Sequence, residues 1–321
     1  MIPNTHTEKL KGNNLNPVIS IACLTFNHEA YIEKTIDSFL SQKTSYSFEI
    51  VIGDGGSTDG NKEILRKYQS IHGEEKIKLL FPEKDPGIGG MLNQIFLECR
   101  GEFVCFCEGD DYWVNYDKIE RQVSFLRDNS DYVLLHSDLI YINSFGQQIE
   151  PFESHFLFDE RRQDGIVFET LLQKGIFIYA PTVCFRSSAL SKMKLKTTDS
   201  WFVFDYWYWL LISLEGKFLY QKVVDSVYRR HENGVTQNFD FFKGKYLPLK
   251  SDIILHAVKN NNFKLYKDIL LIEIYKLWRN ELSWKNTKRI IQIFKADYEI
   301  FPSFAVYFLS YWKRKIIKRI L

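Results

Sequence analysis

The sequence predicts an α/β fold with a Rossmann-like, mainly parallel central sheet flanked by helices, and three observations support this prediction. Short apolar runs rich in β-branched residues recur from residue 18 onward, as expected for strands buried on both faces. Between these runs lie segments whose apolar residues have helical spacing, which is typical of βαβ units. Polar residues follow the ends of the runs, at the edge of the sheet where open α/β proteins bind their ligands.

The first third of the chain alternates strand and helix patterns. After the first apolar run, Ile32, Ile36, Phe39 and Leu40 recur at the spacing of one helical face. A loop rich in proline and glycine, PEKDPGIGG, separates the third strand from the next helix. The predicted strands are VISIACL (Val18–Leu24), FEIVI (Phe48–Ile52), IKLLF (Ile77–Phe81) and FVCFC (Phe103–Cys107), and two further helices contain Ile64–Tyr68 and Met91–Cys99.

The second part of the predicted domain has a less regular pattern. The segment Tyr132–His136 (YVLLH) predicts another strand, and Ile176–Arg186 has strand character, with Pro181 marking an edge or a turn. Residues 151–175 lack a clear period, so we expect a flexible loop there. In the aromatic segment WFVFDYWYWLLI, which starts at Trp201, a helix would place Phe204, Trp207, Tyr208 and Leu211 on one face.

The fourth predicted strand leads directly into three acidic residues, Glu108, Asp110 and Asp111. Carboxylates crowded at the end of a buried strand repel one another unless a cation lies among them. Oxygen ligands suit a hard divalent ion, so the arrangement favours a metal site. A solvated acidic turn is the alternative, and it would be the better interpretation of an acidic pair seen alone.

A glycine-rich turn, GDGGSTDG (Gly53–Gly60), follows the second predicted strand. A helix that begins after such a turn presents backbone N–H groups that can bind an anion, so the turn could face a phosphate or a base. The turn lacks the Gly-Lys-Ser/Thr of a P-loop, and the chain has no G-x-G-x-x-G fingerprint. The turn by itself is therefore weak evidence for a nucleotide.

Composition indicates an ordinary soluble globular protein, with 45% hydrophobic and 26% charged residues and a net charge of +2. Five cysteines, three of them within apolar runs, fit packing roles in a reducing compartment better than a disulfide framework. Residues 1–16 have no apolar signal core and are interpreted as a disordered leader. With no apolar run near the length of a membrane span, we expect a cytoplasmic location.

The region 239–321 is predicted to be helical and basic. From Lys250 onward there are 15 Lys and Arg against 6 Asp and Glu. Its last segment, FPSFAVYFLSYWKRKIIKRIL, combines an aromatic apolar stretch with five basic residues. It could lie peripherally on the cytoplasmic face of a membrane or pack on its own domain, and the sequence favours neither. Nucleic acid is not expected as a partner, because no binding motif accompanies the charge.

Several ordered motifs together, VISIACLTFNHEAYIEKTIDSFLSQ, FEIVIGDGGSTDG and GEFVCFCEGDDYW, resemble family 2 glycosyltransferases with the GT-A fold, particularly bacterial enzymes of capsule and O-antigen assembly. The resemblance covers roughly Val18 to Gln237. It implies a GT-A domain at 17–238, divided into a nucleotide-sugar-binding half (17–113) and an acceptor half (114–238).

The resemblance also implies roles for individual residues. Thr25, Asn27 and Asp54 would bind the base of the donor, although many relatives have a second acid where this chain has Gly55. The acidic motif Glu108-Gly109-Asp110-Asp111 would bind the ribose of the donor and a divalent metal, Mn²⁺ or Mg²⁺, with Asp110 as a donor-binding residue and Asp111 as the principal metal ligand. Basic residues of a Tyr-Arg-x-His-like segment would close over the diphosphate, and Trp113 would contact the acceptor. This basic segment contains Arg229, Arg230 and His231, and the implied metal ligands are Asp111, Asp110 and His231.

In relatives, an acid at the start of the aromatic helix is the catalytic base, and Asp205 fits this position best, with Asp199 in reserve. A carboxylate among aromatic residues is partly desolvated, which raises its pKa and suits a proton acceptor. The alternative is an acid that merely stabilises the helix N-terminus.

The predicted function is metal-dependent, inverting transfer of a sugar from a nucleotide-diphosphate sugar, most simply a UDP-sugar, to a glycan or lipid-linked acceptor. Two other classes remain open. A sugar-1-phosphate nucleotidyltransferase should have a basic glycine-rich loop after its first strand, where this chain has Thr25-Phe26-Asn27-His28. A non-catalytic carbohydrate-binding module would need no base.

Overall fold

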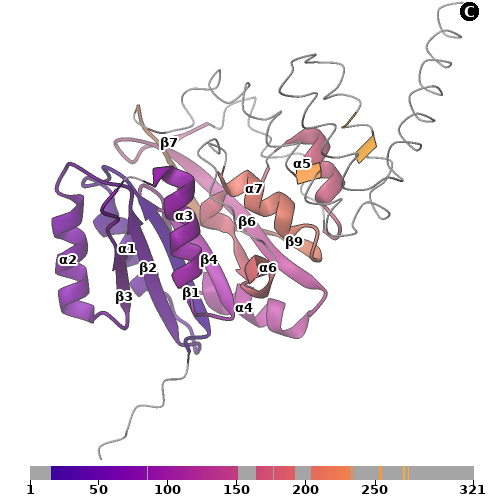
Figure 1. Cartoon of the computed structure of the whole chain (residues 1–321), viewed down its shortest axis with the longest axis horizontal. Coiled ribbons are helices and arrows are strands. Elements are labelled where there is room, and N and C mark those ends of the chain that lie inside the picture. Colours follow the sequence, from indigo (N-terminus) through magenta and orange to yellow (C-terminus); the bar gives the residue numbers. More distant parts are fainter. Residues whose placement is uncertain are drawn as a thin grey trace, which may run out of the picture.

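The computed structural model describes residues 16–84, 86–150, 164–175, 177–191, 204–232 and 234, together with five residues further along the chain: 253, 254, 270, 271 and 274. Within these residues the chain forms a single mixed sheet flanked by helices (Figure 1). Its strand order is β3-β2-β1-β4-β8-β6-β9-β5, and β7 pairs with β6.

The first four strands form the parallel half of the sheet, as predicted. β1 lies between β2 and β4, and β2 also pairs with β3, with all three pairings parallel. The side chains of β1, β2 and β4 are almost completely buried, because helices cover both faces of the sheet, whereas most of those of β3, at the edge, are half-buried. Each strand agrees with its predicted range to within two residues; the observed bounds are β1 Ile19–Thr25, β2 Phe48–Asp54, β3 Ile77–Leu80 and β4 Phe103–Glu108.

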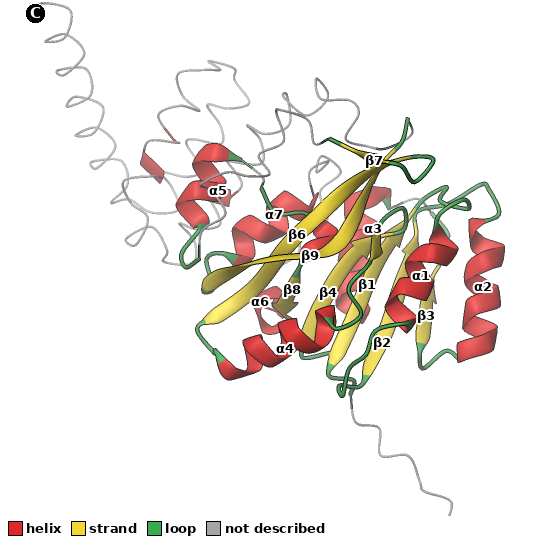
Figure 2. Ribbon diagram, turned by 180° about the vertical axis from the view of Figure 1, so that it is seen from behind, coloured by secondary structure: helices red, strands yellow, loops and turns green. Residues whose placement is uncertain are grey.

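Helices α1 (Ile32–Leu40) and α4 (Lys118–Asp128) cover one face of the sheet (Figure 2), and α3 (Gly87–Glu98) and α7 (Phe204–Ile212) cover the other (Figure 1). Helix α2 (Asn61–His72) packs beside α1. Side chains of β1 alternate between the two resulting cores: Ile19, Ile21 and Cys23 point to α1, and Ala22 and Leu24 point to α3.

The second part of the domain builds the mixed half of the sheet from strands distant in sequence. The long strands β6 and β9 run parallel to each other, whereas β8 is antiparallel to both β4 and β6. The short strand β5 pairs with β9 at the edge. The bounds are β5 Tyr112–Trp113, β6 Tyr132–Asn143, β7 Gln148–Ile149, β8 Cys184–Arg186, β9 Lys217–Arg230, and the short helices are α5 Phe168–Lys174, α6 Ser188–Ser191 and the 3-10 turn η1 Ala180–Thr182.

Three local predictions are corrected here. In the described residues 177–186, strand structure is limited to β8, because Pro181 lies in the 3-10 turn. The segment predicted as a loop at 151–175 contains α5, and residues 151–163 lie outside the described part. Helix α3 begins at Gly87, inside the predicted loop. Burial of α7 also extends beyond the predicted face, since Tyr206 and Trp209 are as inaccessible as Trp207, Tyr208 and Leu211.

The chain ends are only partly described. Residues 1–15, which include almost all of the predicted leader, lie outside the described residues, as does most of 239–321. The five described residues beyond 250 are helical and buried in the core that contains α3 and α7. None of the helices in the described parts of the chain has the length and apolar character needed to cross a lipid bilayer.

Candidate active site

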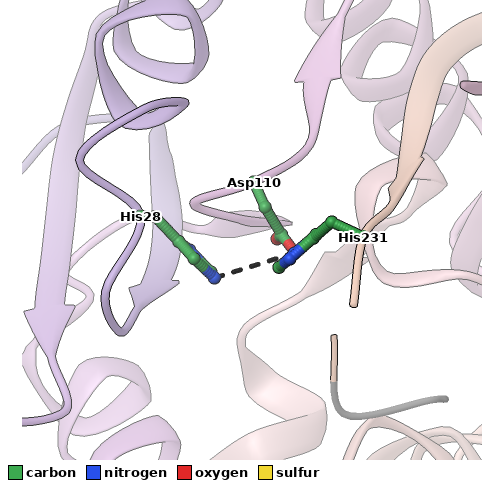
Figure 3. Close-up of side chains that lie close together, drawn as sticks. All are labelled: His28, Asp110 and His231. Carbon is green, nitrogen blue, oxygen red and sulfur yellow. Dashed lines mark hydrogen bonds and ion pairs between the residues drawn. The ribbon is translucent and has the colours of Figure 1, made fainter. Parts of the chain in front are cut away.

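Four segments meet at the carboxyl end of the parallel strands. They are the loop after β1, the turn after β4, the end of β9 and the first turn of α7. Figure 3 shows three of the side chains that converge: His28 follows β1, Asp110 follows β4, and His231 follows β9. The fourth segment contributes Asp205. Local sequence sets the end of each strand, but the sheet order brings these ends together.

The acidic turn after β4 contains three carboxylates in close proximity. One oxygen from each of Glu108, Asp110 and Asp111 lies within 4.8 Å of the others. Asp111 is fully buried, and its Oδ1 accepts a hydrogen bond of 2.8 Å from the backbone N–H of Arg229. Its other oxygen, Oδ2, is buried without a hydrogen-bond partner. Burial, followed by the charges of Asp110 and Glu108, raises the pKa of Asp111 well above its usual value.

Asp110 lies between two histidines. The Nε2 atom of His231 is 2.9 Å from Asp110 Oδ2, and Nε2 of His28 is 3.7 Å from the same oxygen. Burial alone would raise the pKa of Asp110, but the two imidazoles together hold that pKa below its usual value. Burial lowers the pKa of His28, which favours its neutral, ligand-competent form.

The backbone of the acidic turn is fixed by its neighbours. The hydroxyl of Thr35, on α1, lies 2.6 Å from the carbonyl oxygen of Asp111 and 3.0 Å from that of Gly109. A Cβ atom at Gly109 would lie 2.6 Å from Oγ1 of Thr25 and 3.0 Å from Nδ1 of His28, so only glycine fits there. The acidic side chains are therefore presented by a turn with little freedom to move.

The residues predicted to bind the base mainly shape the two loops beside the site. Asp54 is fully buried, and its Oδ1 accepts hydrogen bonds from the backbone N–H groups of Gly56 and Ser57. Its Oδ2 accepts one from Asn61, which also receives the hydroxyl hydrogen of Thr25. Asp54 and Thr25 therefore direct their side chains into the protein, and any effect on a ligand would act through the turn that they hold.

Asn27 connects the loop after β1 to the glycine-rich turn. Its Oδ1 accepts a 2.8 Å hydrogen bond from the backbone N–H of Thr58, and its own N–H donates to Ser57 Oγ. Its φ of 54° places it in the left-handed region, which asparagine tolerates better than most residues. Gly55 is the position where this chain departs from the family pattern. A Cβ atom there would make ordinary van der Waals contact with Phe26, so a larger residue could be accommodated.

Arg229 and Arg230 face different surroundings. Arg229 is buried, donates from Nε to the carbonyl oxygen of Asp110, and stacks over Tyr31. Its guanidinium thus supports the acidic turn from behind. Desolvation lowers the pKa of Arg230, although the neighbouring tyrosine hydroxyls of Tyr228 and Tyr141 oppose this shift.

Asp205 lies near the acidic turn in the environment that the sequence predicts. Burial raises its pKa to about 7, although hydrogen bonding from the backbone N–H of Tyr206 opposes this shift. Its charge also contributes to the raised pKa of Glu108, whose principal cause is burial. The first turn of α7 therefore faces the cluster of carboxylates. The reserve candidate, Asp199, lies outside the described residues.

Trp113, which was predicted to contact an acceptor, lies in the core. Its side chain is 4% exposed, its indole N–H donates to the carbonyl oxygen of Pro181, and its ring packs against Phe39. The residue belongs to the core beneath the site. Conversely, the sequence interpretation assigned no role to His28 or Thr35. For His28 the available signal was its position beside Asn27, at the end of the first strand.

These residues fit a divalent cation. The donors are hard carboxylate oxygens and imidazole nitrogens, and a second potential set, His28, Asp110 and His231, also has its ligand atoms within 4.8 Å of one another. Asp111 Oδ2, which is buried and unpaired, is the strongest sign, because an unsatisfied buried carboxylate oxygen costs about 1–3 kcal/mol or more.

Comparison with known proteins identifies the family. Residues 20–196 match the model described as glycosyl transferase family 2. This match covers more than half of the chain, which therefore belongs to the family 2 glycosyltransferases. Among curated relatives, TuaG of Bacillus subtilis, a putative teichuronic acid biosynthesis glycosyltransferase, is 33% identical over 117 residues, which cover 36% of this chain and 45% of TuaG. An uncharacterised protein of Mycobacterium tuberculosis is 22% identical over 217 residues, 68% of this chain and 60% of that protein.

The chain thus spans at most about 60% of the length of these curated relatives. Two solved structures share its fold. TarS of S. aureus (residues 1–349), in complex with UDP-GlcNAc, has a TM-score of 0.55 and 18% identity, with 86% of this chain and 79% of TarS covered. The mannosyltransferase PcManGT of Pyrobaculum calidifontis, in complex with GDP-Man and Mn²⁺, has a TM-score of 0.55 and 15% identity, covering 94% and 81%. The predicted GT-A fold is confirmed.

Proposed function

We propose that this protein transfers a sugar from a nucleotide-diphosphate sugar to an acceptor hydroxyl. The observation that carries this proposal is the buried, unpaired Oδ2 of Asp111 within a cluster of carboxylates and imidazoles at the ligand-binding edge of the sheet. A purely structural acid in that position would pair both oxygens. Membership of the glycosyltransferase family indicates that the reaction in which this cluster takes part is glycosyl transfer.

The residues that would hold a divalent cation, Mn²⁺ or Mg²⁺, are Asp111, Asp110 and His231, which belong to two possible ligand sets that share Asp110. When bound, the cation would neutralise the negative charge that grows on the departing nucleoside diphosphate. The protein's own part is to keep these ligands in place through Thr35 and Arg229, which fix the turn from opposite sides. The pre-formed geometry avoids a cost of reorganisation during the reaction.

Asp205 would be the general base. With a pKa raised to about 7, its carboxylate can accept the proton of the acceptor hydroxyl near neutral pH. Attack of that hydroxyl on the anomeric carbon, opposite the departing diphosphate, is a single displacement that inverts the anomeric centre. A covalent intermediate is not required, since one acid suffices for proton removal.

The donor is proposed to be a UDP-sugar, with Thr25, Asn27 and Asp54 shaping the loops around the base and Arg230 near the diphosphate. Support comes from TarS, which was crystallised with UDP-GlcNAc, although PcManGT holds GDP-Man. For the acceptor we propose a glycan or lipid-linked oligosaccharide of a surface polysaccharide, in keeping with the name of TuaG. Such an enzyme would act at the cytoplasmic face of the membrane.

The test is a thermal-shift panel of nucleotide sugars with and without Mn²⁺. A ligand that binds only the folded state raises the melting temperature, by an amount that grows with concentration over Kd. We expect one nucleotide sugar to give a metal-dependent shift, and Asp111→Ala to remove it. Turnover of that sugar onto glycan acceptors then tests transfer. If no nucleotide sugar shifts the melting temperature in either condition, the proposal fails.

A further inference from the structure

His28 is a second histidine at the acidic turn, and the proposed reaction gives it no task. It follows β1, whereas Asp110 follows β4 and His231 follows β9, so three separate segments bring these side chains together (Figure 3). A role for His28 here rests on the metal site of the proposed function and concerns which atoms hold the metal.

The atoms of these three residues already lie near coordination geometry. His231 Nε2 is 2.9 Å and His28 Nε2 is 3.7 Å from Asp110 Oδ2, and one ligand atom of each residue lies within 4.8 Å of the others. Ligand atoms around one cation, at bond lengths of about 2.1 Å, are separated by roughly 3–4 Å. Only small side-chain rotations are needed to enclose an ion.

Hydrogen bonding within the protein does not explain the presence of a histidine at position 28. Its Nδ1 is buried without a hydrogen-bond partner, and within the described residues its Nε2 makes no hydrogen bond, because 3.7 Å to Asp110 is too long. A histidine retained for hydrogen bonding would use at least one nitrogen, since leaving buried polar atoms unpaired is costly. The second independent sign is Asp111, fully buried with its own Oδ2 unpaired beside the same Asp110.

We infer that His28 is a metal ligand, and that with Asp110 and His231 it forms a site of two imidazoles and one carboxylate. Two nitrogen donors favour transition-metal ions over Mg²⁺, which prefers oxygen ligands and dehydrates reluctantly. His28 would therefore determine metal preference. The competing arrangement uses the oxygen set of Glu108, Asp110 and Asp111, which would bind Mg²⁺ comparably and leave His28 outside.

The deciding measurement is pulsed EPR of Mn²⁺ bound to the full chain labelled with ¹⁵N-histidine, without nucleotide. We expect couplings to two histidine nitrogens in the wild type and to one in His28→Ala and in His231→Ala. Calorimetry should show that His28→Ala weakens Mn²⁺ binding about 10-fold or more, since even partners of metal ligands are worth about 10- to 100-fold. Mg²⁺ affinity should change less than Mn²⁺ affinity.

His72→Ala is the matched control, because His72 is an exposed histidine at the end of α2 and should change neither measurement. His28→Gln, which keeps a side chain of similar length, serves if the alanine variant does not fold. A single coupling in the wild type that persists in His28→Ala overturns the inference and leaves the proposed function intact. Absence of Mn²⁺ binding by the wild type overturns both the inference and the metal dependence. Two couplings without sugar transfer would retain the inference and reject the function.

Discussion

The environment of Asp205 raises the pKa of its carboxyl group. Burial removes water from it, and hydrogen bonds from the backbone N–H groups of Tyr206 and of Asp205 itself only partly offset the loss. A group with a pKa near the working pH is an effective proton acceptor. The same feature carries a cost for folding, because the charged form is better solvated in the unfolded chain.

Asp205→Asn should abolish turnover while leaving donor binding nearly unchanged, because asparagine cannot accept the proton yet has the same shape. We expect kcat to fall by about 100-fold or more, in line with the usual effect of general bases. Donor affinity from calorimetry is the control. Full transferase activity in this variant would show that another residue is the base.

The pH dependence of Asp205 should appear in both activity and stability. Its folded pKa of about 7 lies above the unfolded value, so the proton stabilises the fold, and this contribution is lost as pH rises from about 4 to 7. The rate should instead rise through a midpoint near pH 7, where the base becomes free. Melting temperatures across this range should show a smaller decline in Asp205→Asn. Identical pH profiles of stability in the two proteins would contradict the assignment.

At the level of elements, α1 supports the site from beneath. Its Thr35 is buried and reaches across to the turn after β4, and the end of β9 holds the other side of this turn through the N–H of Arg229. The helix packs on the sheet through Ile32, Ile36 and Phe39. The position of the carboxylates is therefore coupled to packing between α1 and the sheet.

Thr35→Val should lower the free energy of unfolding by about 1–3 kcal/mol, because it leaves buried carbonyl oxygens without a donor. It should also weaken Mn²⁺ binding, since the turn that carries Asp111 loses a fixed point. Thr35→Ser keeps the hydroxyl and is expected to restore the metal affinity. Denaturant unfolding and calorimetry measure the two effects. If serine and valine bind Mn²⁺ equally, the hydroxyl does not position the turn.

Over the whole molecule, charge is divided between the catalytic domain and the remaining chain. The residues before Lys250 carry about −7 and those from Lys250 onward about +9. Five of the basic residues lie beyond residue 312 and follow an aromatic apolar stretch. Such a combination suits an anionic lipid surface, which would bring the domain to a lipid-linked acceptor.

A variant that ends at Phe301 should bind anionic vesicles more weakly than the full chain. Each basic residue near the surface contributes about 1 kcal/mol, so the loss should be large and should shrink as salt increases. Sedimentation with anionic and with neutral vesicles measures the difference. Equal sedimentation of both proteins with anionic vesicles would show that this segment does not bind the membrane.

Agreement between sequence and structure varies along the molecule for physical reasons. The parallel strands β1 to β4 were predicted within two residues, because a strand buried on both faces has an almost continuous apolar run. The two-residue strand β5 was missed, since it exists only through pairing with β9, more than a hundred residues later. The burial of Trp113, which was predicted to contact an acceptor, was not foreseen for the same reason: it depends on Pro181 and Phe39, which are distant in sequence.

The sequence by itself determined the α/β class, the ligand-binding edge and the acidic turn, because apolar periodicity and strand-end polar residues are local properties. Only the tertiary structure showed that the side chain of Asp54 accepts hydrogen bonds within its own turn and that the backbone N–H of Arg229 donates to Asp111. It alone also showed that His28 lies close to Asp110 and His231. The contacts of Arg229 and His28 join segments far apart in the chain. Their distances follow from the order of strands in the sheet and the packing of helices on it, which no local pattern encodes.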